Sequence, residues 1–326
     1  MAALLAARGY ALARQLGSGG MGEVYEVEDR VAGESVALKV LAARLADRPA
    51  MGARMAEEAL ALAQLRHPNV VALRAAGALP DGRPFVAMEL LRGRTLDVLT
   101  RSSGPVLPFE AVRYVCALLR ALAATHRAGL VHCDVKPSNV FVCDDGTVKL
   151  LDFGAAERAA PAPAPQAGRW RCSTLAERGT VRPGIYSPAR AGEVVCTTRW
   201  IERVGSRPLL GTPRYMAPER RAGEPATARC DLYGVGLLLE ELLVQGDPHA
   251  TVLFRIARRA SAASPGARFA SARQMERALR AAERILCRCS RPSEPSRALE
   301  QLGCGNESPD DPQDAFDACS AAFFSS

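Results

Sequence analysis

Four polar side chains that could act together on a phosphate lie close to one another in the sequence: Asp134, Lys136, Asn139 and Asp152. Apolar runs at residues 140–142 and 148–151 flank an Asp-Asp-Gly turn, and this pattern predicts a short hairpin. Because a hairpin brings its two ends side by side, the oxygens of Asn139 and Asp152 can face one ion. Such oxygens suit Mg2+, which also keeps phosphate oxygens in its shell. A carboxylate that can accept a hydroxyl proton, beside two magnesium ligands, is what phosphoryl transfer needs.

This stretch resembles the catalytic loop and the metal loop of the eukaryotic-type protein kinases, in the Ser/Thr form found in bacteria. The catalytic loop is matched by VHCDVKPSN at residues 131–139, and the metal loop by DFG at residues 152–154. The resemblance implies that Asp134 orients a hydroxyl and accepts its proton, and that Lys136 steadies the γ-phosphate. It also implies that Asn139 and Asp152 hold Mg2+.

A glycine-rich turn lies near the N-terminus between two strand-like runs. Its glycines would let the backbone come close to phosphates and offer N–H groups to them. Because a strand rather than a helix follows the turn, the context disfavours a dinucleotide-binding fold. The resemblance implies that the turn covers the phosphates of ATP, with these residues at the nucleotide: Leu16, Gly17, Ser18, Gly19, Gly20, Met21, Gly22 and Val24.

A lysine and a glutamate are expected to form an ion pair in the first part of the chain. Lys39 lies in the strand-like run VALKV, and the resemblance implies that it binds the α- and β-phosphates. Glu58 lies on the apolar stripe of a helix expected over residues 51–66. A carboxylate on such a stripe is costly to bury unless it is paired, so we expect Lys39 as its partner. Glu57, which lies off the stripe, is the alternative.

A strand expected over residues 84–91 ends where the resemblance implies the hinge of a nucleotide pocket. Met88 would guard the back of this pocket, and backbone groups of Glu89 and Leu91 would bond the adenine. Three apolar residues would sandwich the ring: Val24, Ala37 and Phe141. Apolar residues at these positions would also suit a plain core.

The resemblance covers residues 10 to about 282 and implies an α+β, two-lobed protein-kinase-like fold. A small β-rich lobe is expected over residues 10–91 and a larger, mainly helical lobe over residues 92–282. Residues 1–9 would be an N-terminal extension. A helix expected over residues 108–128 would support the catalytic loop.

The run GTPRYMAPE at residues 211–219 resembles the substrate platform and the end of the activation segment. Thr212 in this platform and Lys136 are typical of the Ser/Thr branch of the family. The resemblance also implies that Arg268 pairs with Glu219, and that Asp231 accepts N–H bonds from the catalytic loop.

The chain departs from the family pattern in the length of two segments. The activation-segment insert, residues 155–210, is longer than usual, with nine Arg, four Glu and both tryptophans of the chain. We expect part of it to dock on this lobe or on a partner, and a tolerated surface insertion is the alternative. The stretch after Gly246 is shorter than usual, which predicts a shortened end of the C-lobe.

A third departure is Cys133, which stands where most loop-regulated members have Arg, so the chain is of the non-RD type. Without that Arg, activity is predicted to depend less on loop phosphorylation. Self-phosphorylation sites are expected among Ser206, Thr197, Thr198, Ser173 and Thr174, with Ser206 favoured. Loss of activity in Ser206→Ala would contradict this prediction. The thiol of Cys133 is interpreted as inert, and a redox-sensitive thiol is the alternative.

Composition sets outer limits on the function. The chain has 326 residues and a formal net charge of +7, an excess too modest and dispersed to indicate a nucleic-acid partner. No run is long and apolar enough for a membrane span. The ten cysteines have no framework spacing, which favours reduced thiols and a cytoplasmic location.

The end of the chain, residues 283–326, is acidic and rich in Pro, Ser and Gly, and it is expected to be mostly disordered. Four cysteines in this part of the chain are a weak indication of a metal site: Cys287, Cys289, Cys304 and Cys319. An acidic tail and a basic insert could also attract each other and regulate the chain. Unchanged activity after truncation at Ala282 would count against this hypothesis.

Taken together, these features predict an enzyme that transfers the γ-phosphate of ATP to Ser or Thr hydroxyls of proteins, itself included. A catalytically silent, kinase-like ATP-binding module is the alternative. Silent relatives typically lack the Lys, the catalytic Asp or the metal Asp, and here Lys39, Asp134 and Asp152 are all present. A small-molecule phosphotransferase is disfavoured by the platform at residues 211–219.

Overall fold

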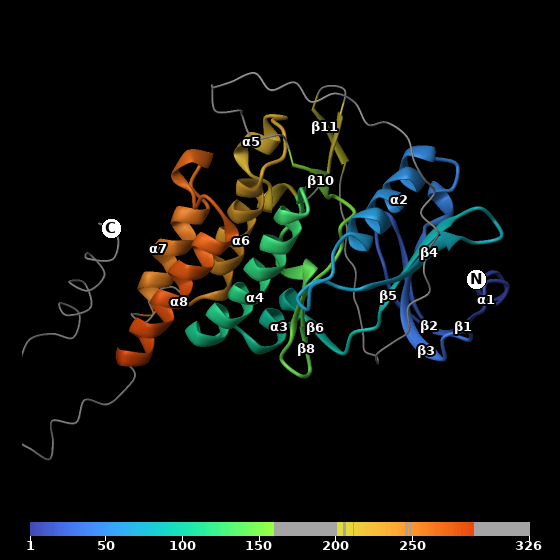
Figure 1. The fold of residues 1–326 in the computed structure, drawn as a ribbon, viewed down its shortest axis with the longest axis horizontal. Helices are drawn as coiled ribbons and strands as arrows, with labels where there is room; N and C mark the ends of the chain where they lie inside the picture. Colours follow the sequence, from blue (N-terminus) through green and yellow to red (C-terminus); the bar gives the residue numbers. More distant parts are fainter. Residues whose placement is uncertain (160–200, 205–206, 211, 245–246, 248–249, 290–326) are drawn as a thin grey trace, which may run out of the picture.

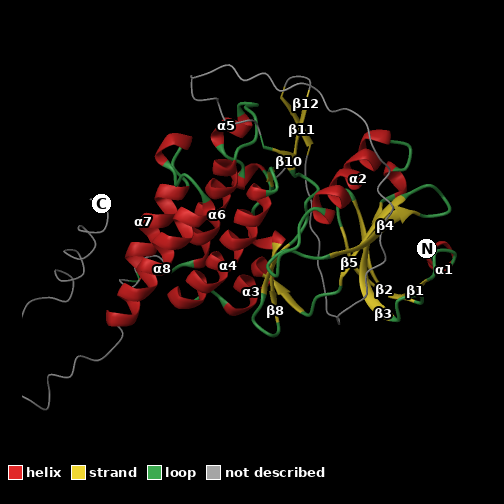
Figure 2. Ribbon diagram, in the orientation of Figure 1, coloured by secondary structure: helices red, strands yellow, loops and turns green. Residues whose placement is uncertain are grey.

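The structure is a computed structural model that describes residues 1–159, 201–204, 207–210, 212–244, 247 and 250–289. Its strands gather in one lobe and its helices dominate the other (Figure 2), which confirms the expected two-lobed fold. Most of the insert, all five phosphorylation candidates and the end of the chain, including Cys304 and Cys319, lie outside the described residues.

The small lobe is built on one antiparallel sheet of five strands in the order β1-β2-β3-β5-β4. Alternate residues of β3 and β5 face opposite sides, as the period of two in a strand requires. One side packs on helix α2 (Pro49–Ala63), and the other packs on Leu5 of the short helix α1 (Ala2–Ala6). The strands are β1 (Tyr10–Ser18), β2 (Gly22–Asp29), β3 (Glu34–Leu41), β4 (Leu73–Ala78) and β5 (Pro84–Glu89).

Helix α4 (Pro108–Arg127) is the central element of the large lobe (Figure 1). Buried side chains such as Val112, Val115, Leu119 and Leu122 recur at helical spacing, and α4 packs against α6, α8 and strand β9. The helix expected over residues 108–128 is thus confirmed. The other helices here are α3 (Leu96–Ser103), α5 (Pro218–Arg221), α6 (Ala228–Leu242), α7 (Thr251–Ala260) and α8 (Ala272–Cys289).

Short strands lie near the junction of the two lobes, and two of them form the predicted hairpin (Figure 1). Strands β8 (Val140–Cys143) and β9 (Val148–Leu150) pair as expected, with β6 (Gly93–Thr95) on the other side of β8. Strand β7 (Leu130–Val131) pairs with β10 (Glu157–Arg158), at the start of the activation segment. Near the end of that segment, β11 (Ile201–Val204) pairs with β12 (Arg207–Leu210).

The last helix corrects one expectation from the sequence. Residues 283–326 are expected from the sequence to be mostly disordered, but α8 continues to Cys289. The apolar side chains Leu279, Ala282 and Leu286 follow one another at helical spacing and are fully buried. The expectation of disorder is therefore wrong for residues 283–289.

A second difference lies in the shortened stretch before Arg268, where α7 was not expected. Its buried residues Val252, Leu253, Ile256 and Ala257 pack into the core of the large lobe. Among the helices of the described part of the chain, none is long and apolar enough to cross a bilayer.

Candidate active site

A buried lysine bridges two carboxylates at the junction of the lobes. The Nζ atom of Lys39 lies 2.8 Å from both carboxylate oxygens of Glu58 and 2.9 Å from Oδ1 of Asp152. All three side chains are almost fully buried. The ion pair expected between Lys39 and Glu58 is therefore present in the structure, and Asp152 adds a second anion to it.

The two carboxylates respond differently to their shared cation. Burial opposes ionisation of Asp152, but the charge and hydrogen bond of Lys39 outweigh it and lower the pKa of Asp152 to about 2. At Glu58 burial is the larger effect and raises the pKa above its ordinary value, although Lys39 acts against it. The site therefore holds more negative than positive charge when both carboxylates are ionised.

Local backbone geometry brings these groups together. Lys39 lies on the face of β3 that also carries Ala37 and packs toward α2, so its side chain reaches Glu58. Asp152 has a left-handed backbone, with φ of 53°, directly after the hairpin. A Cβ at Gly154 would lie 3.1 Å from Oδ1 of Asp152, so glycine leaves room for this carboxylate.

Asp134 lies at the centre of a second network, in the loop after β7. Its Oδ2 accepts hydrogen bonds from Nζ of Lys136 at 2.5 Å and from Nδ2 of Asn139 at 3.1 Å. Its Oδ1 accepts the backbone N–H of Thr212 at 2.8 Å. Nζ of Lys136 also donates to the hydroxyl of Thr212 at 2.7 Å. The catalytic-loop candidates and the platform residue therefore meet in one place.

Asp231, at the start of α6, holds the backbone of this loop in place. Its carboxylate accepts the backbone N–H groups of His132 and Cys133 and bonds to the ring of His126. Cys133 has φ of 64°, a strained backbone for a residue other than glycine. A Cβ at Gly234 would lie 2.8 Å from the carbonyl oxygen of Val135, so α6 approaches the loop closely. The role expected of Asp231 is met, whereas sequence reasoning missed His126.

A cleft at the lobe junction holds several of the nucleotide candidates. It is lined by Val24, Ala37, Lys39, Glu58, Met88 and Glu89, and also by Asn139 and Asp152. Val71, Ser138 and Leu151 line it as well, although sequence reasoning did not single them out. Ser138 and Leu151 lie next to Asn139 and Asp152 in the chain, but sequence reasoning gives them no role of their own. The sequence alone therefore does not show that they reach the cleft.

Other nucleotide candidates lie outside this lining. Phe141 is fully buried in β8 opposite Thr95, and Leu91 is buried just after β5. The backbone N–H of Glu89 donates to the carbonyl of Ala72. The glycine-rich turn joins β1 to β2 without lining the cleft: Leu16, Gly17 and Ser18 lie in β1, Gly19, Gly20 and Met21 in the turn, and Gly22 in β2.

The donor atoms at the hairpin ends fit a hard cation. Asn139 and Asp152 line the same cleft, and Nδ2 of Asn139 is used by Asp134, which leaves its amide oxygen as the atom for a ligand. Carboxylate and amide oxygens are the ligands that Mg2+ takes in proteins. Elsewhere in the described part of the chain, no group of three or more His, Cys, Asp or Glu could hold a metal.

Two charged pairs fix the end of the activation segment. Both guanidinium nitrogens of the buried Arg268 donate to the carboxylate of Glu219, at 2.6 and 2.7 Å, as expected. Arg220, the next residue, pairs with Glu157 of β10. Sequence reasoning missed this second pair, because nothing local links two residues 63 positions apart.

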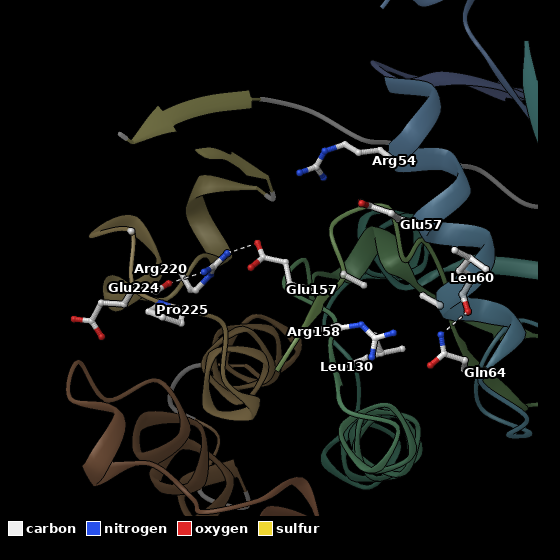
Figure 3. Close-up of a pocket in the computed structure, with 13 residues that line it drawn as sticks. Arg54, Glu57, Leu60, Gln64, Leu130, Glu157, Arg158, Arg220, Glu224 and Pro225 are labelled. Atoms are coloured by element: carbon white, nitrogen blue, oxygen red, sulfur yellow. Dashed lines mark hydrogen bonds and ion pairs between the residues drawn. The ribbon is translucent and has the colours of Figure 1, made fainter. Parts of the chain in front are cut away.

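Arg220 and Glu157 border a cavity of about 550 Å³ (Figure 3). The cavity lies between α2, β10 and the end of α5, and Arg54 extends from α2 above it. Arg54 donates to the carbonyl of Gly154, so it ties α2 to the metal loop. Burial lowers the pKa of Arg54 from its ordinary value, although Glu57 and Glu157 act against this.

Comparisons with known proteins agree with this geometry. The sequence profile described as protein kinase domain matches residues 10–175, about half of the chain. A probable serine/threonine-protein kinase of Streptomyces coelicolor is 35% identical over 242 residues, which are 73% of this chain and 30% of that protein. Serine/threonine-protein kinase PknD of Mycobacterium tuberculosis is 35% identical over 240 residues, 74% of this chain and 30% of that protein.

Solved structures show the same likeness. A double mutant of the Mycobacterium tuberculosis PknI kinase domain superposes with a TM-score of 0.60 at 26% identity, over 84% of this chain and 96% of that one. The chain spans about a third of the length of the curated relatives it matches.

Proposed function

Because this chain belongs to the protein kinase family, in its bacterial serine/threonine branch, we propose that it transfers the γ-phosphate of ATP to Ser or Thr hydroxyls of proteins. Hydroxyls of its own activation segment are a second class of acceptor. Five free thiols among the described residues suit a reducing compartment with ATP, such as the cytoplasm.

In this proposal Asp134 is the residue that orients the acceptor hydroxyl and takes its proton. One oxygen of its carboxylate is fixed by the backbone of Thr212 and the other by Lys136 and Asn139. Fixed in this way, the carboxylate needs little rearrangement when the hydroxyl arrives. Lys136, already beside it, would stabilise negative charge on the transferred phosphoryl group.

Lys39 would bind the α- and β-phosphates, with Glu58 holding its side chain in place. Asn139 and Asp152 would hold Mg2+, which when bound neutralises phosphate charge. Val24, Ala37 and Met88 present apolar surface to the cleft, as the adenine ring requires.

One observation supports this proposal most strongly. The hydroxyl and backbone of Thr212 both bond to the Asp134–Lys136 pair, so the platform and the catalytic loop form one unit. A silent binding module would gain nothing from this arrangement, because Asp134, Lys136 and Thr212 do not line the cleft proposed for the nucleotide. The same unit presents a protein hydroxyl more readily than a small molecule, since the platform flanks the carboxylate.

The test is transfer of labelled γ-phosphate, with Mg2+, onto the protein itself and onto a generic basic protein. Asp134→Asn should reduce transfer by about 10²- to 10⁴-fold, the usual contribution of a general base. Asp144→Asn, in the exposed turn of the same hairpin, is the matched control and should keep full activity. Both variants should bind ATP as the wild type does. Absence of transfer from folded, ATP-binding wild type would favour the silent module instead.

A further inference from the structure

An ion pair that the proposed chemistry does not use lies beside the catalytic loop. The guanidinium of Arg220 pairs with the carboxylate of Glu157 at 2.5 Å, and its other nitrogen donates to the carbonyl of Glu224 (Figure 3). The side chain of Arg220 is 8% exposed and that of Glu157 is 37% exposed. The arginine is therefore held from two sides in a largely buried position.

The Glu157 end of this pair is joined directly to the catalytic loop. Glu157 pairs with Val131 across the β7–β10 ladder, and the backbone N–H of Ala159 donates to the carbonyl of Gly129. Asp134 lies three residues after the end of β7. A force that holds β10 in place therefore also holds the strand that leads into the loop.

The Arg220 end is fixed to the large lobe. Arg220 follows Glu219, whose carboxylate is held by the fully buried side chain of Arg268. The pair thus ties the beginning of the activation segment, at β10, to its end, at α5. Figure 1 shows β10 between α5 and α2, which agrees with such a tie.

The residue before Asp134 is Cys133, and its chemistry explains why the ion pair between Arg220 and Glu157 is needed. The position offers no cation to a phosphate on the activation segment, because a thiol is neutral here. Burial raises the pKa of the Cys133 thiol well above its ordinary value, Asp231 and Glu157 raise it further, and Arg220 acts against them. The backbone register agrees with this, since Glu157 pairs with Val131, two residues before Cys133. The carboxylate of Glu157 is therefore a negative charge, built into the chain itself, that pairs with Arg220 at the start of the activation segment.

We propose that the Arg220–Glu157 ion pair, called here the segment clamp, positions the catalytic loop and makes phosphoryl transfer independent of phosphate on the activation segment. Both residues are positioning residues, since neither touches the cleft where the chemistry is proposed. The inference rests on the proposed kinase function and names the way in which that function is regulated.

The clamp is tested in the full chain with Glu157→Gln, Arg220→Gln and the double variant. Each single variant should lower kcat by about tenfold or more, since a misplacement of about 1 Å can cost a hundredfold. The KM for ATP should stay within about twofold, because the cleft is not touched. The double variant should be no worse than the singles, since the two side chains act as one unit.

Two matched changes separate the clamp from general damage. Glu57 lines the same cavity and forms no ion pair with any residue that the structure describes, so Glu57→Gln should leave kcat unchanged. Arg220→Lys keeps the cation and should restore at least about a third of the activity lost in Arg220→Gln. Equal losses in Glu57→Gln and Glu157→Gln, or additive losses in the double variant, would overturn the proposal.

Independence from phosphate is measured on wild type treated with a phosphatase and then freed of it. Intact mass gives the phosphate content while the initial rate is recorded. The initial rate should equal that of untreated protein, with no lag. A lag that ends as phosphate accumulates on residues 155–210 would overturn the proposal.

Hydrogen exchange keeps this test separate from that of the proposed function. In Glu157→Gln the backbone amides of residues 130–134 should exchange about tenfold faster than in wild type, whether or not the chain is active. If wild type transfers no phosphate but exchange rises as stated, the kinase proposal fails while the clamp itself stands. Unchanged exchange in an active protein would remove the clamp alone.

Discussion

The carboxylate of Asp231 accepts the backbone N–H of Cys133 at 2.8 Å, across 98 residues of sequence. This bond holds a residue with a left-handed backbone one position before Asp134. The geometry of the catalytic loop therefore depends on the start of helix α6, an element that contributes no residue to the lining of the cleft.

Replacement of Asp231 by Asn should destabilise the protein by about 3 kcal/mol. The amide presents one oxygen in place of two, so a buried N–H of the loop loses its acceptor. Urea unfolding measures the loss, and kcat should fall because Cys133 is no longer held. Asp144→Asn, on the exposed hairpin turn, is the control and should change neither quantity. A loss below about 0.5 kcal/mol would contradict the role assigned to this bond.

The contribution of Asp231 to stability should depend on pH in a defined direction. Burial opposes its ionisation, but the hydrogen bond and charge of His126, and then His132, hold its pKa below the ordinary 3.8. A carboxylate with a lowered pKa in the folded state stabilises that state fully above its unfolded pKa and progressively less below it. The stability difference between wild type and Asp231→Asn should be constant from about pH 5 to 7 and shrink below about pH 3.8. A difference that grows as pH falls would refute the assignment.

Glu58 and Glu57 are adjacent in α2, but only Glu58 should matter for activity. Glu58→Gln removes the charge that holds Lys39 between two carboxylates, so the ammonium group should shift toward Asp152. We expect kcat/KM for ATP to fall by about 10- to 100-fold. In Glu57→Gln the same measurement should stay within about twofold. Equal effects would show that the ion pair with Lys39 is not the reason for the loss.

Cys133 should be an inert thiol despite its place beside the catalytic residue. Burial raises its pKa well above the ordinary value, so little thiolate forms near neutral pH. Labelling with iodoacetamide, followed by peptide mass mapping, should modify the exposed Cys287 at least about tenfold faster. Labelling of Cys133 at the rate of Cys287 would instead favour the redox-sensitive alternative.

The motifs in the sequence predicted the architecture and much of the candidate site. The spacing of Asp134, Lys136 and Asn139, followed by a hairpin and Asp152, leaves few other ways to arrange these groups, and the structure brings them together. The apolar stripe of α2 also predicted the right carboxylate partner for Lys39, because a buried charge needs a counter-charge.

What sequence reasoning missed depends on distant parts of the chain or on averaged composition. Arg220 and Glu157 meet because the beginning and the end of the activation segment come together in the fold, with β10 paired to β7. No local sequence pattern shows this. The average composition of residues 283–326 is polar, and for this reason sequence reasoning missed the extension of α8. Leu286 nevertheless continues the apolar spacing of Leu279 and Ala282. In residues 283–289, burial of apolar side chains against the large lobe decides the structure, although the average composition favours disorder.

The anchoring of the activation segment bears on how its length can vary. Ala159 is fixed to Gly129 at one end, and Thr212 is fixed to Asp134 at the other. The entropy lost in joining two fixed points grows only with the logarithm of the chain between them, and a doubling costs about 0.6 kcal/mol. Insertions between these anchors are therefore thermodynamically inexpensive. A long segment at this place is compatible with an unchanged catalytic loop, and descendants of this sequence could lengthen or shorten it without rebuilding the site.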